Sequence, residues 1–229
     1  MEALLASLLH PLLPNVDWTE IGYASLDTLS MLGGSLLFTL LLGLPLGVLL
    51  FLSGPRQLFA QPALYGLLSL LANVLRSVPF VILLILMIPL TVLLTGTSLG
   101  VAGAIPPLVV GATPFFARLV ETALREVDRG IIEATQAMGA STWQIITRAL
   151  LPEALPGILA AITVTAITLV SYTAMSGLIG GGGLGDLAVR YGYQRYQPDV
   201  MAVTVVLLLV LVQILQNTGD KLVVHFSRK

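Results

Sequence analysis

The sequence predicts an all-α, polytopic membrane protein with five transmembrane helices. Apolar residues make up 56% of the 229 and charged residues only 10%, and the mean hydropathy is +0.96. Roughly a quarter of the residues in soluble proteins are charged. A helix needs about 20 residues to cross a hydrocarbon core of about 30 Å. Five apolar windows are long enough to do so: 28–52, 65–92, 99–120, 157–178 and 200–219.

The first three spans differ in regularity. Residues 28–52 contain no charged residue. The next two are interrupted by an arginine or by prolines: Arg76, Pro79 and Pro89 in the second, and Pro106, Pro107 and Pro114 in the third. Proline removes a backbone donor and bends a helix, so we expect both spans to be kinked.

The fourth span, 157–178, is apolar but rich in Ser and Thr, whereas the fifth is a Val and Leu run. Four polar residues of the fourth span recur at spacings of three and four and share one helical face, with Met175 beside them: Thr165, Thr168, Tyr172 and Ser176. Polar side chains in a membrane also serve to pack helices together, which suffices for any one of these residues. As a set, we expect the face to line a translocation path.

The distribution of Lys and Arg predicts that the N-terminus lies outside and the C-terminus inside, because positive residues stay on the cytoplasmic side. Five spans place nine of the 11 Lys and Arg inside, the exceptions being Arg190 and Arg195. We therefore expect a periplasmic segment 1–24, a membrane domain 25–219 and a cytoplasmic tail 220–229. Two arginines near the inner ends of spans, Arg76 and Arg118, are expected to extend to the headgroups.

A charged island lies between the third and fourth spans, and this orientation places it in the cytoplasm. Asp128 can N-cap a short helix over 131–138, and Gly139 can supply the left-handed residue that ends it. Ser141 and Gln144 form a capping box for a second helix.

The island as a whole, 128–156, is stopped by Pro152 and Pro156 and anchored at both ends by spans. A soluble partner that grips it can therefore move the membrane helices. Small residues, Ala134 and Ala140, would let the island enter a groove, while Glu133 could cap its helix or meet a cation of the partner. The alternative is an ordinary helical hairpin on the membrane surface.

The spacing in the island resembles the EAA motif of ATP-binding-cassette (ABC) importer permeases. That motif reads Glu-Ala-Ala, three residues, Gly, nine residues, Ile, one residue, Leu-Pro. Five positions match: Glu133, Ala134, Gly139, Leu151 and Pro152. Thr135 replaces the third small residue and Ala149 replaces the Ile.

Within this family the chain is similar to the permeases of methionine importers. Four blocks carry the likeness: 72–80, 114–118, 151–157 and 180–185. The resemblance implies a homodimeric, multi-pass protein of the bacterial inner membrane, bound to two copies of an ABC ATPase and fed by a periplasmic or lipid-anchored binding protein. It implies ATPase docking by the five matching residues and Ala140. ATP and Mg would be bound by the ATPase, and no cofactor by this chain.

Other classes of function find little support. The chain has no P-loop sequence, no cysteine and only two distant histidines, so we expect neither a nucleotide site, a metal site nor a catalytic centre. Basic patches with interleaved aromatics, typical of nucleic-acid binding, are missing. Residues 180–185 fit Gly-x-Gly-x-x-Gly but follow a span rather than a strand. We interpret them as a flexible external turn leading into 186–196, which could meet the binding protein.

Three alternatives stay open. The chain could be a permease for another small amino acid, an ion-gradient-driven carrier or channel, or a membrane scaffold without transport activity. We find no firmly central Asp or Glu in the predicted spans, which argues against a proton-coupled carrier.

Overall fold

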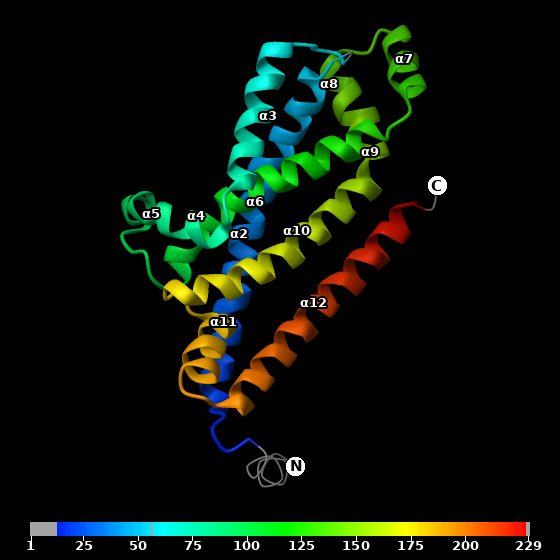
Figure 1. Cartoon of the computed structure of the whole chain (residues 1–229). Helices are drawn as coiled ribbons and strands as arrows, with labels where there is room; N and C mark the ends of the chain where they lie inside the picture. Colours follow the sequence, from blue (N-terminus) through cyan, green and yellow to red (C-terminus); the bar gives the residue numbers. More distant parts are fainter. Residues whose placement is uncertain (1–12, 56, 228–229) are drawn as a thin grey trace. The chain divides into compact units, whose positions relative to one another are not determined.

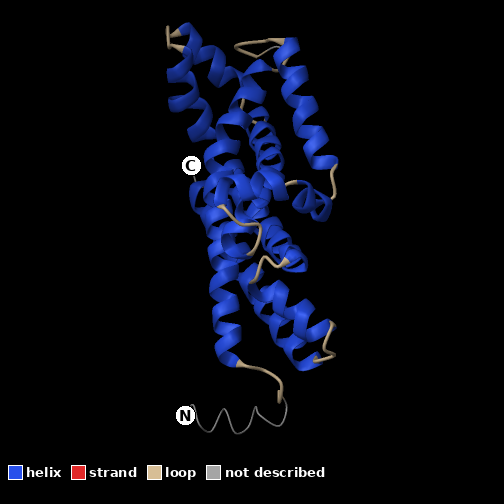
Figure 2. Cartoon of the chain, turned by 90° about the vertical axis from the view of Figure 1, so that its left-hand side faces the viewer, coloured by secondary structure: helices blue, strands red, loops and turns tan. Residues whose placement is uncertain are grey.

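The computed structural model describes residues 13–55 and 57–227, and its regular structure in these ranges is helical throughout (Figure 1; Figure 2). Four helices are long and apolar enough to cross a membrane: α2 (Trp18–Ser53), α6 (Gly100–Arg125), α10 (Leu155–Ser176, continued by the 3-10 turn Gly177–Ile179) and α12 (Pro198–Ser227). The all-α membrane fold predicted from the sequence is therefore confirmed.

The second predicted span is not one kinked helix. The chain forms α3 (Pro62–Ser77) and α4 (Phe80–Leu86), which are bent by 101° relative to one another, followed by α5 (Ile88–Thr95). Val78, at the break, is extended (φ −77°, ψ 125°), because the ring of a following proline disfavours the helical conformation. Counting the bent pair as one span gives five candidate spans, and counting only the long helices gives four.

Other boundaries also differ from the predictions. Helix α2 begins ten residues before the predicted start of the first span, and α6 runs as one helix through all three of its prolines. Helix α12 continues to Ser227, so the predicted boundary between span and tail at residue 219 falls inside a helix. Half of the predicted periplasmic segment (residues 1–12), together with Arg56, Arg228 and Lys229, lies outside the described residues.

The chain folds into two compact units, the first made of residues up to 35, 80–108 and 168–214, and the second of the remainder. In the second unit, a continuous apolar core joins α2, α6 and the island, and its largest fully buried members include Phe51, Phe116, Leu124 and Leu150. This core therefore holds the island to the membrane helices.

In the first unit, the glycine-rich turn adopts a conformation that depends on its glycines. Gly180, Gly182 and Gly183 adopt φ values near +80°, which other residues rarely adopt. The Gly100 N–H donates to the Gly180 carbonyl (2.9 Å), and the Leu184 N–H donates to Thr28 Oγ1 (2.9 Å). The turn opens into α11 (Gly183–Leu187) and the π-helical segment η3 (Ala188–Tyr193).

Small residues set the approach of α2 to α6 in the second unit. A Cβ atom at Gly43 would lie 2.7 Å from Phe116 Cδ1, and one at Gly47 would lie 2.6 Å from the Ala117 carbonyl oxygen. The two glycines are four residues apart and therefore on one helical face. Close backbone approach through small residues is how helices gain packing energy in a membrane.

We predict that Gly47→Ala destabilises the protein by about 1–3 kcal/mol, because the new methyl group meets a backbone carbonyl that has no room to move. The matched control is Gly66→Ala on α3, where a Cβ atom would have no neighbour within 4 Å. Thermal unfolding in detergent checks both variants. Equal melting temperatures for the two would contradict the packing described here.

Candidate functional site

The first helix of the island forms as its capping residues predict. Helix α7 (Arg129–Ala137) begins after Asp128, whose Oδ1 accepts a hydrogen bond from the Gly130 N–H (2.6 Å). It ends at Gly139 (φ +79°), whose N–H donates to the Gln136 carbonyl (2.9 Å). The Ala140 N–H donates to the Thr135 carbonyl (3.1 Å), which completes a Schellman motif. The observed helix starts two residues before the predicted 131–138.

The second helix also has its predicted cap. The Ser141 N–H donates to Gln144 Oε1 (2.8 Å), and the Gln144 N–H donates to Ser141 Oγ (3.4 Å). The chain then runs through α8 (Thr142–Ile145), the π-helical turn η1 (Ile146–Leu150) and α9 (Leu151–Glu153) before α10 restarts. The wider turn directly precedes Pro152, whose ring would clash with the carbonyl four residues back in a regular helix.

One face of the island is buried and the other is open. Ile132, Ile145 and Leu150 belong to the core of the second unit, with exposed fractions of 9% or less. Four of the six predicted docking residues are exposed, namely Glu133, Ala134, Gly139 and Pro152. The other two, Ala140 and Leu151, are half-buried. The structure thus leaves the predicted docking residues accessible while it fixes the backbone beneath them.

The sequence predictions did not include two large, exposed apolar residues of the island. Met138 is 77% exposed beside Gly139, and Trp143 is 72% exposed in the second helix. Both flank the tight turn, and Met and Trp are enriched in the centres of protein interfaces. The available signal was their position: each lies off the buried Ile and Leu stripe of its short helix.

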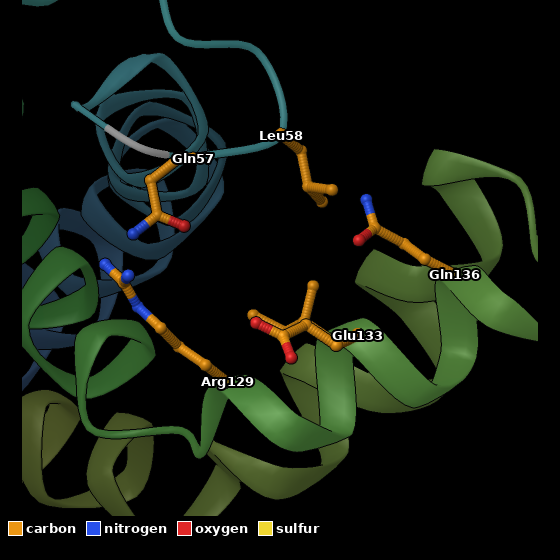
Figure 3. Close-up of a pocket in the computed structure, with 6 residues that line it drawn as sticks. Gln57, Leu58, Arg129, Glu133 and Gln136 are labelled. Atoms are coloured by element: carbon orange, nitrogen blue, oxygen red, sulfur yellow. The ribbon is translucent and has the colours of Figure 1, made fainter.

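A polar hollow of about 270 Å³ adjoins α7. Figure 3 shows Arg129, Glu133 and Gln136 along α7, with Gln57 and Leu58 from the α2–α3 connection opposite them. A carboxylate, a guanidinium and two amides therefore surround one opening. Such a hollow can accept a polar or charged side chain of a partner.

A charged cluster crosslinks α3 and α6 in the second unit. Glu121 has a side chain only 5% exposed and is clamped by two arginines of its own helix, Arg118 (Nη1 to Oε2, 2.7 Å) and Arg125 (Nη2 to Oε1, 2.7 Å). The Tyr65 hydroxyl donates to Glu121 Oε1 (3.2 Å). Arg118 Nη2 also donates to Asn73 Oδ1 (3.3 Å).

This cluster corrects one expectation. Arg118 does not extend freely toward headgroups, since its guanidinium is bound by Glu121 and by α3. Glu121 itself is a buried carboxylate just past the predicted end of the third span at 120 and four residues before the end of α6, so it is not a central acid of a span. The i, i+3 and i, i+4 spacings of the three charges were visible in the sequence, but their burial and the partners on α3 were not.

The predicted polar face of α10 is only partly open. Thr165 and Ser176 are fully buried, and their hydroxyls donate to carbonyls of the same helix, those of Ala161 (2.7 Å) and Thr173 (2.7 Å). Such bonds are typical of hydroxyls that pack within a helix. The other three residues of the face are accessible in part: Thr168 and Tyr172 are half-buried and Met175 is 40% exposed.

Tyr172 also makes the principal aromatic contact of the first unit. Its ring stacks on Phe80, the first residue of α4, with a centroid separation of 4.0 Å and an interplanar angle of 4°. The helix break after α3 therefore places an aromatic ring against α10, which the sequence alone does not reveal.

The segment 186–196 is aromatic and charged, as predicted. Tyr193 is 71% exposed and Tyr196 is 88% exposed. Arg190 pairs with Asp186 (2.7 Å) and with Glu20 at the start of α2 (3.7 Å). The ion pairs hold the segment against α2 while the two tyrosines stay open.

The described residues thus form a protein with several candidate membrane spans and an accessible, capped two-helix segment between two of them. The family of the binding-protein-dependent transport system inner membrane component matches residues 40–223. The chain belongs to this family, and it is a transport subunit rather than an enzyme.

Similar proteins come from distant bacteria. The probable D-methionine transport system permease protein MetI of Vibrio cholerae is 54% identical over 182 residues, which cover 80% of this chain and 81% of that protein. The methionine import system permease protein MetP of Bacillus subtilis is 49% identical over 207 residues, 90% and 93% of the two chains. A chain of the MetNI methionine ABC transporter, solved in inward facing conformations, superposes with a TM-score of 0.90 at 48% identity, covering 91% of this chain and 97% of that one.

We predict that Glu121→Gln costs about 3 kcal/mol of stability, because it leaves the half-buried Arg118 guanidinium without its counter-ion. Glu126→Gln is the matched control, since Glu126 is exposed just beyond the end of the same helix. Melting temperatures of the two purified variants in detergent provide the measurement. Similar small shifts in both would show that the cluster contributes little.

Proposed function

We propose that this chain is the membrane-spanning subunit of an ATP-driven methionine importer. It works as a homodimer that binds two ATPase subunits and receives its substrate from a binding protein outside. The observation that carries the proposal is the near full-length likeness to the chain of the methionine ABC transporter, with 48% identity. The likeness to the methionine permeases of two distant bacteria supports the same substrate.

The proposed orientation places the N-terminus outside and the island in the cytoplasm. The charges within the described residues support it: Lys221 lies in the last turns of α12, whereas residues 13–27 carry Asp17, Glu20 and Asp27 and no Lys or Arg. Positive residues are retained on the cytoplasmic side. We keep 25–219 as the permease domain, with 128–156 as its coupling region, between an outer segment 1–24 and an inner tail 220–229.

In this orientation the open face of the island is the ATPase-docking surface. Glu133, Ala134, Gly139, Ala140, Leu151 and Pro152 contact the ATPase, with Met138 as an additional apolar anchor. The buried isoleucines beneath this surface join the island to α2 and α6, so a displacement of the ATPase is passed to the membrane helices. ATP binding by the paired ATPases then moves the permease between inward-facing and outward-facing states, and ATP with Mg stays on the ATPase.

The direct test is ATP-dependent uptake of labelled L-methionine into vesicles that contain this chain, its ATPase and its binding protein. We predict that Gly139→Asp lowers uptake at least about tenfold, equivalent to 1.4 kcal/mol of docking free energy. It places an unpaired negative charge in the docking surface, where no atom of this chain lies within 4 Å of the new Cβ.

Gly139→Asn is the matched control, because asparagine has nearly the same size, carries no charge and is tolerated in the left-handed conformation. It should retain most of the uptake. Co-purification of the ATPase distinguishes lost docking from lost folding. Normal uptake by Gly139→Asp would refute the docking surface, and no uptake by the wild-type complex would refute methionine as the substrate.

For the translocation path we propose the accessible part of the α10 face, namely Thr168, Tyr172 and Met175. Thr165 and Ser176 support it by packing. The stacked rings of Tyr172 and Phe80 provide a flat apolar surface suited to a thioether side chain, since sulfur contacts with aromatic rings are favourable.

We predict that Tyr172→Ala and Thr168→Trp each reduce methionine uptake several-fold while the complex still assembles. Tyr172→Phe is the control, because it keeps the stacked ring and removes only the hydroxyl, and it should transport nearly as well as the wild type. Uptake and ATPase co-purification are measured side by side. Unchanged uptake in both Tyr172→Ala and Thr168→Trp would remove α10 from the path.

A further inference from the structure

A polar stripe runs along one face of α3 and ends in an arginine. Tyr65, Ser69, Asn73 and Arg76 follow one another at spacings of four, four and three residues, which places them on one face of the helix. The first three contact the charged cluster of α6, through Glu121 and Arg118. Arg76 lies beyond that cluster, and its guanidinium carbon is 5.8 Å from the centre of the Phe115 ring.

Arg76 is the second-to-last residue of α3, at the end away from Pro62. It is 14 residues past Pro62, where α3 begins, or about 21 Å along the helix. Its neighbour Phe115 is ten residues before Arg125, the end of α6, or about 15 Å along that helix. The two helix ends lie together, as the contacts of Tyr65 with Glu121 and Arg125 require. With these helix ends at the inner membrane surface, as in the proposed orientation, and with half of a hydrocarbon core about 15 Å thick, the guanidinium lies near the middle of the core and not at the headgroups expected from the sequence.

Arg118 and Arg76 differ in exposure and in their charged partners. The side chain of Arg118 is 18% exposed and is neutralised by Glu121. Arg76 is exposed on the surface of this chain and has no ion pair with any residue in the ranges 13–55 and 57–227. An ionisable side chain inside a membrane is costly and marks a functional path by default.

The charges of Arg76 and of the neighbouring cluster on α6 also do not balance. Arg76, Arg118 and Arg125 contribute three positive charges, and Glu121 contributes one negative charge. The excess attracts an anion, and the guanidinium fork matches a carboxylate with two parallel hydrogen bonds. A lipid phosphate does not fit, because headgroups lie at the surface of the core and Arg76 lies near its middle.

We propose that Arg76, oriented by the face of Phe115, is the intramembrane subsite for the carboxylate of the transported amino acid. The proposal rests on the proposed importer function and adds to it the group that recognises the charged end of the substrate. Arg76 lies in the second unit and the stacked pair of Tyr172 and Phe80 lies in the first. The subsite explains why an otherwise apolar permease keeps an uncompensated cation in this place.

The first experiment compares uptake of labelled L-methionine by complexes that carry Arg76→Gln, Arg76→Lys and Lys221→Gln. The last variant removes an exposed cation from the far end of α12 and serves as the matched control. Loss of a charge-assisted hydrogen bond predicts a fall of about 10- to 100-fold for Arg76→Gln. Arg76→Lys should fall less, because it keeps the charge. ATPase stimulation by the binding protein should be unchanged in all three.

The second experiment uses the absence of cysteine from the chain. Arg76→Cys is assembled into the complex and then treated with aminoethyl methanethiosulfonate, which adds a positive charge, or with methyl methanethiosulfonate, which adds a neutral group. The wild-type complex, treated in the same way, reports on thiols of the partner subunits. Recovery of uptake with the aminoethyl reagent alone would establish that position 76 needs a cation.

Two results would overturn the subsite: equal uptake by Arg76→Gln and Lys221→Gln, or a loss in Arg76→Cys that the aminoethyl group fails to reverse. The second result would assign Arg76 to packing on Phe115. A mixture of labelled α-amino acids is supplied in parallel, so the charge requirement is measured on whichever one is carried. Uptake of another amino acid in place of methionine would therefore refute the proposed substrate separately from the subsite.

Discussion

A bilayer offers no water to backbone groups, so each N–H and C=O inside it needs a partner within the protein. Two of the non-helical places among the described residues satisfy this constraint in different ways. At the break between α3 and α4, the chain uses Pro79, which has no N–H to leave unpaired. At the glycine turn, the Gly181 N–H donates to the Ser176 carbonyl (2.9 Å), and Thr28 accepts from the Leu184 N–H.

Buried polar side chains need partners within the protein in the same way. The carboxylate of Glu121 is buried only because two guanidinium groups and a tyrosine hydroxyl surround it. These contacts tie α3 to α6, while the glycines of α2 let a third backbone approach closely. The island is attached to this group of helices through buried isoleucines and leucines. Its open face is therefore carried on the buried core of the second unit.

The features that could be predicted from the sequence are those fixed by contacts between residues close together in the chain. The ends of α7 and α8 depend on Asp128, Gly139 and the Ser141–Gln144 pair, whose partners lie within five residues, so their positions could be predicted closely. The break at Val78 was harder, because Pro79 predicts a bend but not one of 101°. The partners of Arg118 and the ring that stacks on Tyr172 come from other helices. Contacts between distant segments leave no signal in the spacing of residues along one chain.

The share of each long helix that is buried has a consequence for how the protein enters the membrane. Helix α12 is among the most apolar, yet only 11% of its spanning window is buried within the chain, so lipid alone can accommodate it as it leaves the translocon. Helix α6 is the least apolar of the four, and half of its window is buried. It carries the Glu121 cluster and depends on α3 to cover those charges. Integration of α6 is therefore a joint event with α3, which is made earlier, whereas α12 can partition independently at the end of synthesis.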